Sequence, residues 1–272
     1  MFSFQQVPLF LDNLANSLSD LAILAITAVT FGVAGGLVAF LANRLWFRRW
    51  PEHDPFDDKL AEAAHTSMLG FSAFVLALLI TNGLTILAQT DAAVRLEATT
   101  IYSLGRELDA LGPSARTAKQ ALESYVQNVT RDEWPHLARV PPTLSPLVQK
   151  NLDDLWVAIR SIQENLGRTA PARGDYRAEL SAYVSRIETL RSGRLSAATI
   201  NIPNDFWIIL LLFVVAASIL SGRENQKPFG MHINVMHISA IGVAIGLVIN
   251  LDNPFRGETS ISSDIIGRAF TP

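Results

Sequence analysis

The chain has 272 residues, of which 49 % are hydrophobic and 17 % are charged, and its formal net charge is −3. Soluble domains are usually about a quarter charged, and the shortage here falls in long apolar runs typical of a membrane protein. The sequence has no basic stripe among aromatic residues, which excludes a nucleic-acid partner. The absence of cysteine excludes disulfides, thiolate catalysis and cysteine-bound metals.

Four membrane-spanning helices are predicted, over residues 21–41, 66–88, 206–220 and 231–251. A helix needs about 20 apolar residues to cross the hydrocarbon core. The third run is short, so we expect it to include residues 200–204 or to lie in a thinned bilayer. The first run has no Lys or Arg before it and no small-residue cleavage site after it, so we expect it to remain in the mature protein. None of the runs contains Asp, Glu, Lys or Arg, which argues against a proton-coupled pump.

Small residues recur at four-residue spacing in two of these runs, at Ala28, Gly32 and Gly36 and at Gly242 and Gly246. Such faces let helix backbones approach closely, so they predict tight helix pairing, within the chain or between subunits. Other polar side chains in the runs either bond neighbouring helices or line a water-filled path. These are Thr81, Asn82, His237, Ser239 and Asn250.

The polar segment between the second and third spans divides the chain into three parts, 1–90, 91–199 and 200–272. Apolar residues at three- and four-residue spacing predict a bundle of four antiparallel helices in the middle part. We expect the first and last of these helices to continue the neighbouring spans. The first should stop at Gly112, which can adopt a left-handed conformation before Pro113.

The segment "TRDEWPHL" closes the second helix of this bundle. Pro135 disfavours helical geometry at Trp134, so the helix should end there. Trp134 would then lie near the lipid headgroups as an interfacial anchor. Alternatively, Asp132 and Glu133 would form a carboxylate ring or a ligand site at the mouth of a vestibule.

Other chemistry is weakly indicated. No two of the five histidines have the four-residue spacing of a helical metal site. The acids of residues 52–58 either bind a divalent cation or form a solvated turn. Arg95 and Arg106 either form ion pairs on an exposed helix face or face a central vestibule, where they would favour anions. We therefore predict no enzyme activity, no cofactor and no metal site.

Short motifs follow one another along the chain in a specific order: "VRLEATTIYSLGREL", "ESYVQNVTRDEWPHL" and, after the last span, "LDNPFRG". In this order and spacing they resemble the bacterial bestrophin-like domain family over nearly the whole chain. The matching positions are His65, Gly70, Phe71, Glu97, Tyr125, Glu133, Trp134, Pro135, Asn253, Pro254, Phe255 and Gly257.

The resemblance implies kinship with bestrophins, which are pentameric anion channels with four spans. It implies a multi-pass protein of the bacterial inner membrane that forms homo-oligomers in the lipid bilayer. Bestrophins have cytoplasmic termini and a cytoplasmic helical domain. Here, six Lys or Arg residues in the first and third loops against two in the C-terminal tail predict the reverse, with both termini and the helical domain outside the cytoplasm.

We therefore predict an oligomeric pore that passes small anions and is lined by the second span. Phe71, Phe74 and Ile80 are the expected apolar constrictions, and Thr81 and Asn82 form the polar stretch. The alternative is a non-transporting membrane scaffold or sensor whose helical domain binds a partner.

Overall fold

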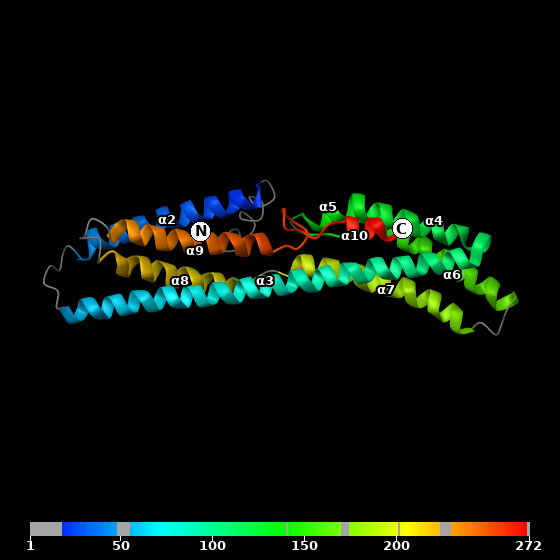
Figure 1. Ribbon diagram of the computed structural model, residues 1–272, viewed down its shortest axis with the longest axis horizontal. Helices are drawn as coiled ribbons and strands as arrows, with labels where there is room; N and C mark the ends of the chain where they lie inside the picture. The colour runs from blue at the N-terminus through cyan, green and yellow to red at the C-terminus, as the bar shows by residue number, and fades with distance from the viewer. Residues whose placement is uncertain are drawn as a thin grey trace. The chain divides into compact units, whose positions relative to one another are not determined.

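The chain folds into two compact units (Figure 1). Unit 1 comprises Met1–Thr85, Asn201–Asp252 and Gly257–Thr259, and unit 2 comprises Ile86–Ile200, Asn253–Arg256 and Ser260–Pro272. The computed structural model describes residues 18–47, 55–139, 141–169, 174–200, 202–223 and 230–270, without the side chains of 55–58, 166–169 and 174–177. Within these ranges all regular structure is helical, which confirms the predicted all-α fold class.

Unit 1 contains long apolar helices. Four helices of the described ranges are long and apolar enough to cross a membrane, although their placement in a bilayer remains a prediction. The helices of this unit are α2 (Asp20–Leu45), the first part of α3 (Pro55–Leu111), α8 (Asn204–Ser221) and α9 (Gly230–Leu251).

The small-residue ladders meet within the chain, where α2 packs against α9. A Cβ atom on Gly242 would lie 2.6 Å from the carbonyl oxygen of Thr27 and 2.9 Å from the Cα of Ala28. A Cβ atom on Gly246 would lie 3.1 Å from the Cα of Leu24. Because only glycine leaves room for the facing backbone, these positions set the close approach of the two helices.

The predicted continuous helix through the third span is wrong, because α7 ends at Thr199 and α8 begins at Asn204. Pro203 stands directly before α8 with an extended backbone, φ −55° and ψ 137°. Proline also disfavours helical geometry at the residue before it, which explains the break. The 18 residues of α8 span about 27 Å.

Unit 2 is a helical domain around one apolar core, in which α4 packs against α6 and α6 against α7. Its elements are the second part of α3, η2 (Gly112–Ala115), α4 (Arg116–Asn128), η3 (Val129–Glu133), α5 (Trp134–Leu137), α6 (Pro146–Thr169), α7 (Gly174–Thr199), α10 (Asp264–Gly267) and η6 (Arg268–Phe270). The predicted apolar stripes supply much of its core: Ile101, Leu104, Leu108, Ala118, Leu122, Val129, Val148, Leu152, Leu155, Ile159, Ile162, Leu180 and Ile187.

Helix α3 confirms that the second span continues into the polar segment as one helix. It ends where the sequence predicts, because Gly112 adopts a left-handed conformation with φ +65°. The next residue, Pro113, has no backbone N–H to continue the helix. Ser114 donates its hydroxyl to the carbonyl oxygen of Leu111 at 2.9 Å.

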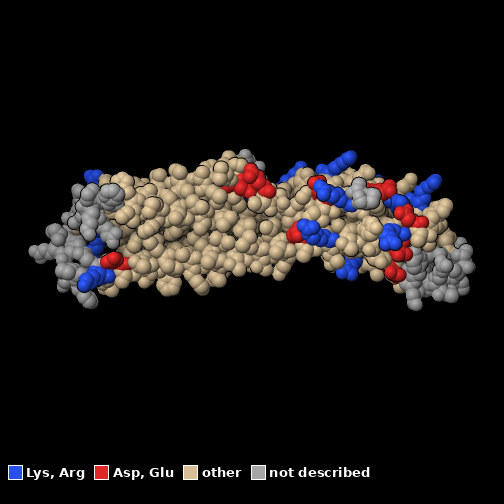
Figure 2. Space-filling view, in the orientation of Figure 1, with Lys and Arg blue, Asp and Glu red and all other residues tan. Residues whose placement is uncertain are grey.

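The surfaces of the two units differ in charge. Figure 2 shows charged side chains spread over unit 2, whereas the face of unit 1 seen there is almost free of them between its ends. Large exposed apolar side chains, including Val33, Ile209 and Met236, lie on the helices of unit 1. This distribution is the one expected of helices in contact with lipid or with other membrane helices.

The packing of α2 on α9 predicts that Gly242→Ala destabilises the protein by about 1–3 kcal/mol, because its Cβ atom would meet the backbone of α2. Gly70→Ala is the matched control, because a Cβ atom there meets no atom within 4 Å. The control should gain slightly from the higher helix propensity of alanine. Unfolding in detergent, followed by circular dichroism, measures both variants, and equal stabilities would contradict this packing.

Candidate functional site

A buried carboxylate, Glu133, lies at the centre of unit 2 and is held by two arginines of α7. The Nε atom of Arg191 donates to both carboxylate oxygens, at 3.1 and 2.9 Å, and its Nη2 donates to Oε2 at 2.6 Å. Arg194 Nη2 donates to the other oxygen, Oε1, at 2.7 Å. The backbone N–H of Ser145 donates to Oε2 at 3.2 Å.

A second buried carboxylate, Glu97 of α3, completes the network. It accepts a hydrogen bond from the hydroxyl of Tyr125 at 2.7 Å and forms an ion pair with Nη1 of Arg194. Arg194 therefore bridges two acids that lie 36 residues apart in the sequence. The network joins α3, α4, η3 and α7, and Arg191 extends it to α6 by donating to Gln149 Oε1 at 2.5 Å.

The four charges of this network are balanced and shielded from water. Glu97 and Glu133 are 0 % exposed, and Arg191 and Arg194 are 2 % and 1 % exposed. Burial raises the pKa of Glu133, and hydrogen bonds from Arg191 oppose that shift. Burial lowers the pKa of Arg194 to about 9, which leaves it protonated at neutral pH. An unpaired charge in this place would be strongly unfavourable, so each of the four requires the others.

Trp134 and the C-terminal motif form the apolar side of the same site. The indole N–H donates to the carbonyl oxygen of Ile261 at 3.0 Å, and the ring of Phe255 meets the indole edge-on at 5.2 Å between centroids. The guanidinium of Arg194 lies 5.6 Å from the centroid of the indole ring. Trp134 is only 8 % exposed, so the predicted headgroup anchor is wrong: the indole is enclosed by unit 2 itself.

The helix does not end before Pro135 as predicted. It widens into the π-helical turn η3 and continues through α5, with Trp134 in right-handed helical geometry at φ −57° and ψ −47°. The Trp134 N–H bonds the carbonyl of Val129, five residues back. Pro135 falls at the start of α5, where a missing N–H is tolerated. Such π turns often occur at functional sites, and here the turn supplies Glu133.

The neighbouring acid, Asp132, supports the start of α6. It accepts a hydrogen bond from the hydroxyl of Ser145. The same hydroxyl oxygen accepts from the backbone N–H groups of Leu147 and Val148, at 3.1 and 3.2 Å. Asp132 and Glu133 are therefore bound by groups of unit 2, and this explains why two acids precede Trp134 in the sequence.

The other motif residues fix turns and helix contacts. Asn253 Oδ1 accepts from the backbone N–H of Phe255 at 2.8 Å, and its Nδ2 donates to the carbonyl of Leu137 at 3.2 Å. The carbonyl of Pro254 accepts from Ile261 N–H at 2.9 Å. Gly257 has φ +83° and lies against Asp20, where a Cβ atom would clash. In unit 1, His65 Nδ1 lies 2.9 Å from the carbonyl oxygen of Ala217.

Most of the predicted pore residues share the exposed side of α3. Phe71 and Phe74 are 53 % and 61 % exposed, and Thr81 and Asn82 are exposed as well. Phe71 also stacks on Phe213 of α8, with ring centroids 5.6 Å apart. Ile80 differs, because it is half-buried against the core of unit 1.

Arg191 and Arg194 are the functional residues that the sequence reasoning missed. They continue the buried stripe of α7, which runs Leu180, Val184, Ile187, Arg191, Arg194 and Ala198. Arginine at positions that helical spacing assigns to a core is the signal that could have found them. Buried arginines are rarely found without a partner, so they call for buried acids nearby.

Metal chemistry finds no support in the ranges that the structure describes. They contain no group of three or more His, Cys, Asp or Glu residues arranged to hold a metal ion. The divalent-cation site or solvated turn predicted for residues 52–58 lies outside the residues whose side chains the structure describes.

Comparison with known proteins identifies the family. A sequence model of the Bestrophin-like domain matches residues 30–266, which is most of the chain. The chain belongs to the bestrophin-like family. The resemblance suggested by the sequence motifs is thereby confirmed, and no curated protein matches the sequence.

Solved structures share the fold at low sequence identity. A bacterial bestrophin homologue from Klebsiella pneumoniae has been solved as several single-substitution variants. One variant is 13 % identical with a TM-score of 0.58, covering 90 % of this chain and 95 % of its own. Another is 14 % identical with a TM-score of 0.55, covering 93 % and 96 %. A further structure, described as a membrane protein, is 13 % identical with a TM-score of 0.55, covering 89 % and 95 %. At these identities the likeness establishes a bestrophin-like fold.

The charge network predicts a large stability loss in Glu133→Gln. The variant leaves Arg191 and Arg194 with one negative charge fewer in a buried place, so unfolding should become easier by about 3–5 kcal/mol. Asp109→Asn is the control, because Asp109 pairs with Lys119 on the exposed surface, where such pairs contribute little. Thermal unfolding in detergent measures both, and a Glu133→Gln protein as stable as the control would refute the network's role.

The buried hydroxyl of Tyr125 should lose its proton only at strongly alkaline pH. Burial raises its pKa well above the ordinary value of 10, and nearby Glu133 adds to the shift. The folded protein therefore holds this proton after the unfolded chain has released it. Its contribution to stability is complete below pH 10 and is lost as pH rises toward the folded pKa. The pKa of Tyr183 is also raised, by burial and by Glu179, but less than that of Tyr125. Phenolate absorbance should therefore show a last-titrating tyrosine that disappears in Tyr125→Phe and persists in Tyr183→Phe. A last-titrating component that is unchanged in Tyr125→Phe would count against the assignment.

Proposed function

We propose that the protein forms a homo-oligomeric pore for small anions, in which the exposed side of α3 in unit 1 lines the conduit. The observation that carries this proposal is the side-chain distribution along α3. Phe71, Phe74, Leu78, Thr81 and Thr85 are exposed at intervals of three and four residues. This spacing places them on one face of the helix.

The opposite face of α3 supports the proposal because it is buried in the core of unit 1. Leu76 and Leu79 are buried in the core of unit 1 together with residues of α8 and α9, including Leu210 and Ile238. Helix α3 is thus packed on one side, and apart from the stacking of Phe71 on Phe213 its exposed side is not covered by another helix in the residues that the structure describes. A ring of copies would bring the exposed faces together around an axis, as closed oligomers do.

The order of side chains on the exposed face suits a gated pore. Phe74 and Leu78 are large and apolar, whereas Thr81, Asn82 and Thr85 follow with polar groups. Narrow apolar rings can stop ions by excluding water, and polar stretches stabilise them in passage. The half-buried Ile80 is a weaker candidate constriction than Leu78, which lies on the exposed face.

Anion preference is supported by α3 within unit 2. Its exposed residues there include Arg95, Thr99 and Arg106. Asp91 pairs with Arg95 at 2.8 Å and offsets part of its charge. Guanidinium groups repeated around a ring would raise the local anion concentration. Membership of the bestrophin-like family favours the same function.

Chloride flux into liposomes tests the proposal. Phe74→Ala should increase flux several-fold, because a smaller ring side chain weakens the apolar constriction. Phe40→Ala on α2 is the matched control, since Phe40 is a comparably exposed aromatic residue on another helix, and it should leave flux unchanged. Liposomes without protein supply the background. No flux above background from inserted, folded protein would overturn the pore and favour a scaffold or sensor.

Orientation is proposed from the sequence alone, with unit 2 and both termini outside the cytoplasm. Periplasmic and cytoplasmic reporters fused after Pro272 distinguish the two orientations. The proposal predicts activity of the periplasmic reporter only. Activity of the cytoplasmic reporter alone would contradict it, while leaving the pore proposal intact.

A further inference from the structure

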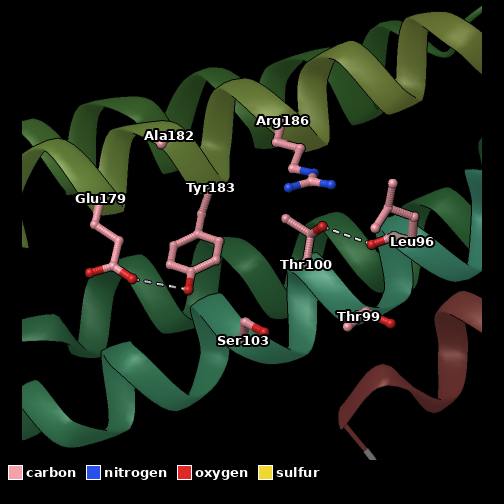
Figure 3. Close-up of a pocket in the computed structure, with 8 residues that line it drawn as sticks. All are labelled: Leu96, Thr99, Thr100, Ser103, Glu179, Ala182, Tyr183 and Arg186. Carbon is pink, nitrogen blue, oxygen red and sulfur yellow. Dashed lines mark hydrogen bonds between the residues drawn. The ribbon is translucent and has the colours of Figure 1, made fainter.

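A groove of about 340 Å³ lies between α3 and α7 within unit 2, apart from the buried charge network (Figure 3). Its volume falls within the range of small-molecule sites. The residues that line it are Leu96, Thr99, Thr100, Ser103, Glu179, Ala182, Tyr183 and Arg186.

The groove carries one charge of each sign on the same helix. Glu179 and Arg186 are seven residues apart on α7, which separates their backbones by about 10 Å, or two helical turns. Figure 3 shows the carboxylate and the guanidinium well apart, with the ring of Tyr183 between them. The lining residues therefore carry no net charge, and the carboxylate of Glu107 adds a negative charge close enough to act on Tyr183.

A hydroxyl group lies beside each of the two charges. Near the negative end, the Tyr183 hydroxyl donates to Glu179 at 3.3 Å, and its oxygen remains available as an acceptor. Near the positive end, the Thr100 hydroxyl donates to the carbonyl of Leu96 at 2.7 Å. Ser103 lies on the α3 wall facing Tyr183, and its hydroxyl can donate or accept.

We propose that this groove binds a small linear zwitterion, a molecule with a carboxylate at one end and an ammonium group at the other. The carboxylate meets Arg186, whose planar guanidinium suits bidentate contact with carboxylates. The ammonium group meets Glu179 and the Tyr183 hydroxyl. The connecting methylene chain lies along the Tyr183 ring and the side chain of Ala182.

Ligands of other charge fit less well. A simple carboxylic acid would leave Glu179 without a cation, and a simple amine would leave Arg186 without an anion. A dicarboxylate would place one negative charge beside Glu179. The single carboxylate of the lining is too few for a divalent metal, which prefers several oxygen ligands.

Binding at this groove is independent of the proposed pore, but its effect on flux would rest on that proposal. Leu96, Thr99 and Ser103 continue along α3 the spacing of three and four residues seen in unit 1. If that face lines a conduit, a bound zwitterion would lie on the conduit wall and reduce anion flux.

Calorimetric titration of the full-length protein in detergent at low salt tests the proposal with 5-aminopentanoate, pentanoate and pentylamine. These probes share a carbon chain and differ only in their charged ends. The zwitterion should bind about five- to tenfold more tightly than either single-charged probe. Arg186→Gln should remove its advantage over pentylamine, and Glu179→Gln should remove its advantage over pentanoate.

Arg160→Gln and Glu164→Gln, both exposed on α6 outside the groove, are the matched controls and should bind the zwitterion as the unmodified protein does. Equal affinity for zwitterion and pentanoate, or no binding of any probe, would overturn the proposal. So would equal losses in the control variants. Since binding is measured without flux, failure here leaves the pore proposal standing, and absence of flux leaves the binding result standing.

Discussion

The buried network of Glu97, Glu133, Arg191 and Arg194 is the constraint on which unit 2 depends. Its members come from α3, η3 and α7, and Arg191 also donates to the backbone carbonyl of Ser145 ahead of α6. Hydrophobic contacts are not directional, so they tolerate small shifts of one helix along another. A shift that separated the buried ion pairs would leave unpaired charges in the core, which is strongly unfavourable. The π turn supplies Glu133, the backbone N–H of Ser145 ahead of α6 donates to its carboxylate, and the guanidinium of Arg194 lies near the indole of Trp134.

This account separates two kinds of residue in the bestrophin-like motifs. The buried ones, such as Glu97, Tyr125 and Trp134, hold unit 2 together and are poorly placed to meet a permeating ion. The exposed ones include Phe71, which lies on the exposed side of α3 and meets α8 through the ring of Phe213. The motifs that reveal the family are therefore largely structural, and the proposed conduction belongs to a less distinctive row of exposed residues on α3.

Periodicity predicted the fold well because burial follows helical spacing. The stripe through Leu122 and the glycines at 242 and 246 lie where that argument puts them. It missed Arg191 and Arg194 because it counts only apolar residues at core positions. It misplaced Trp134 because the rule for residues before proline is local, whereas the partner of its indole N–H, Ile261, lies 127 residues away. Contacts of that range come from tertiary packing and leave no trace in a local pattern.

The central claim is that α3 presents its exposed face to a water-filled conduit in the assembled protein. Because the chain has no cysteine, single cysteines can be introduced along residues 71–85 without background labelling. Reaction with a membrane-impermeant thiol reagent in liposomes should be fast at positions 74, 78, 81 and 85 and slow at the buried positions 76 and 79. Uniformly slow labelling of the exposed face, as expected of helices surrounded by lipid, would contradict the account.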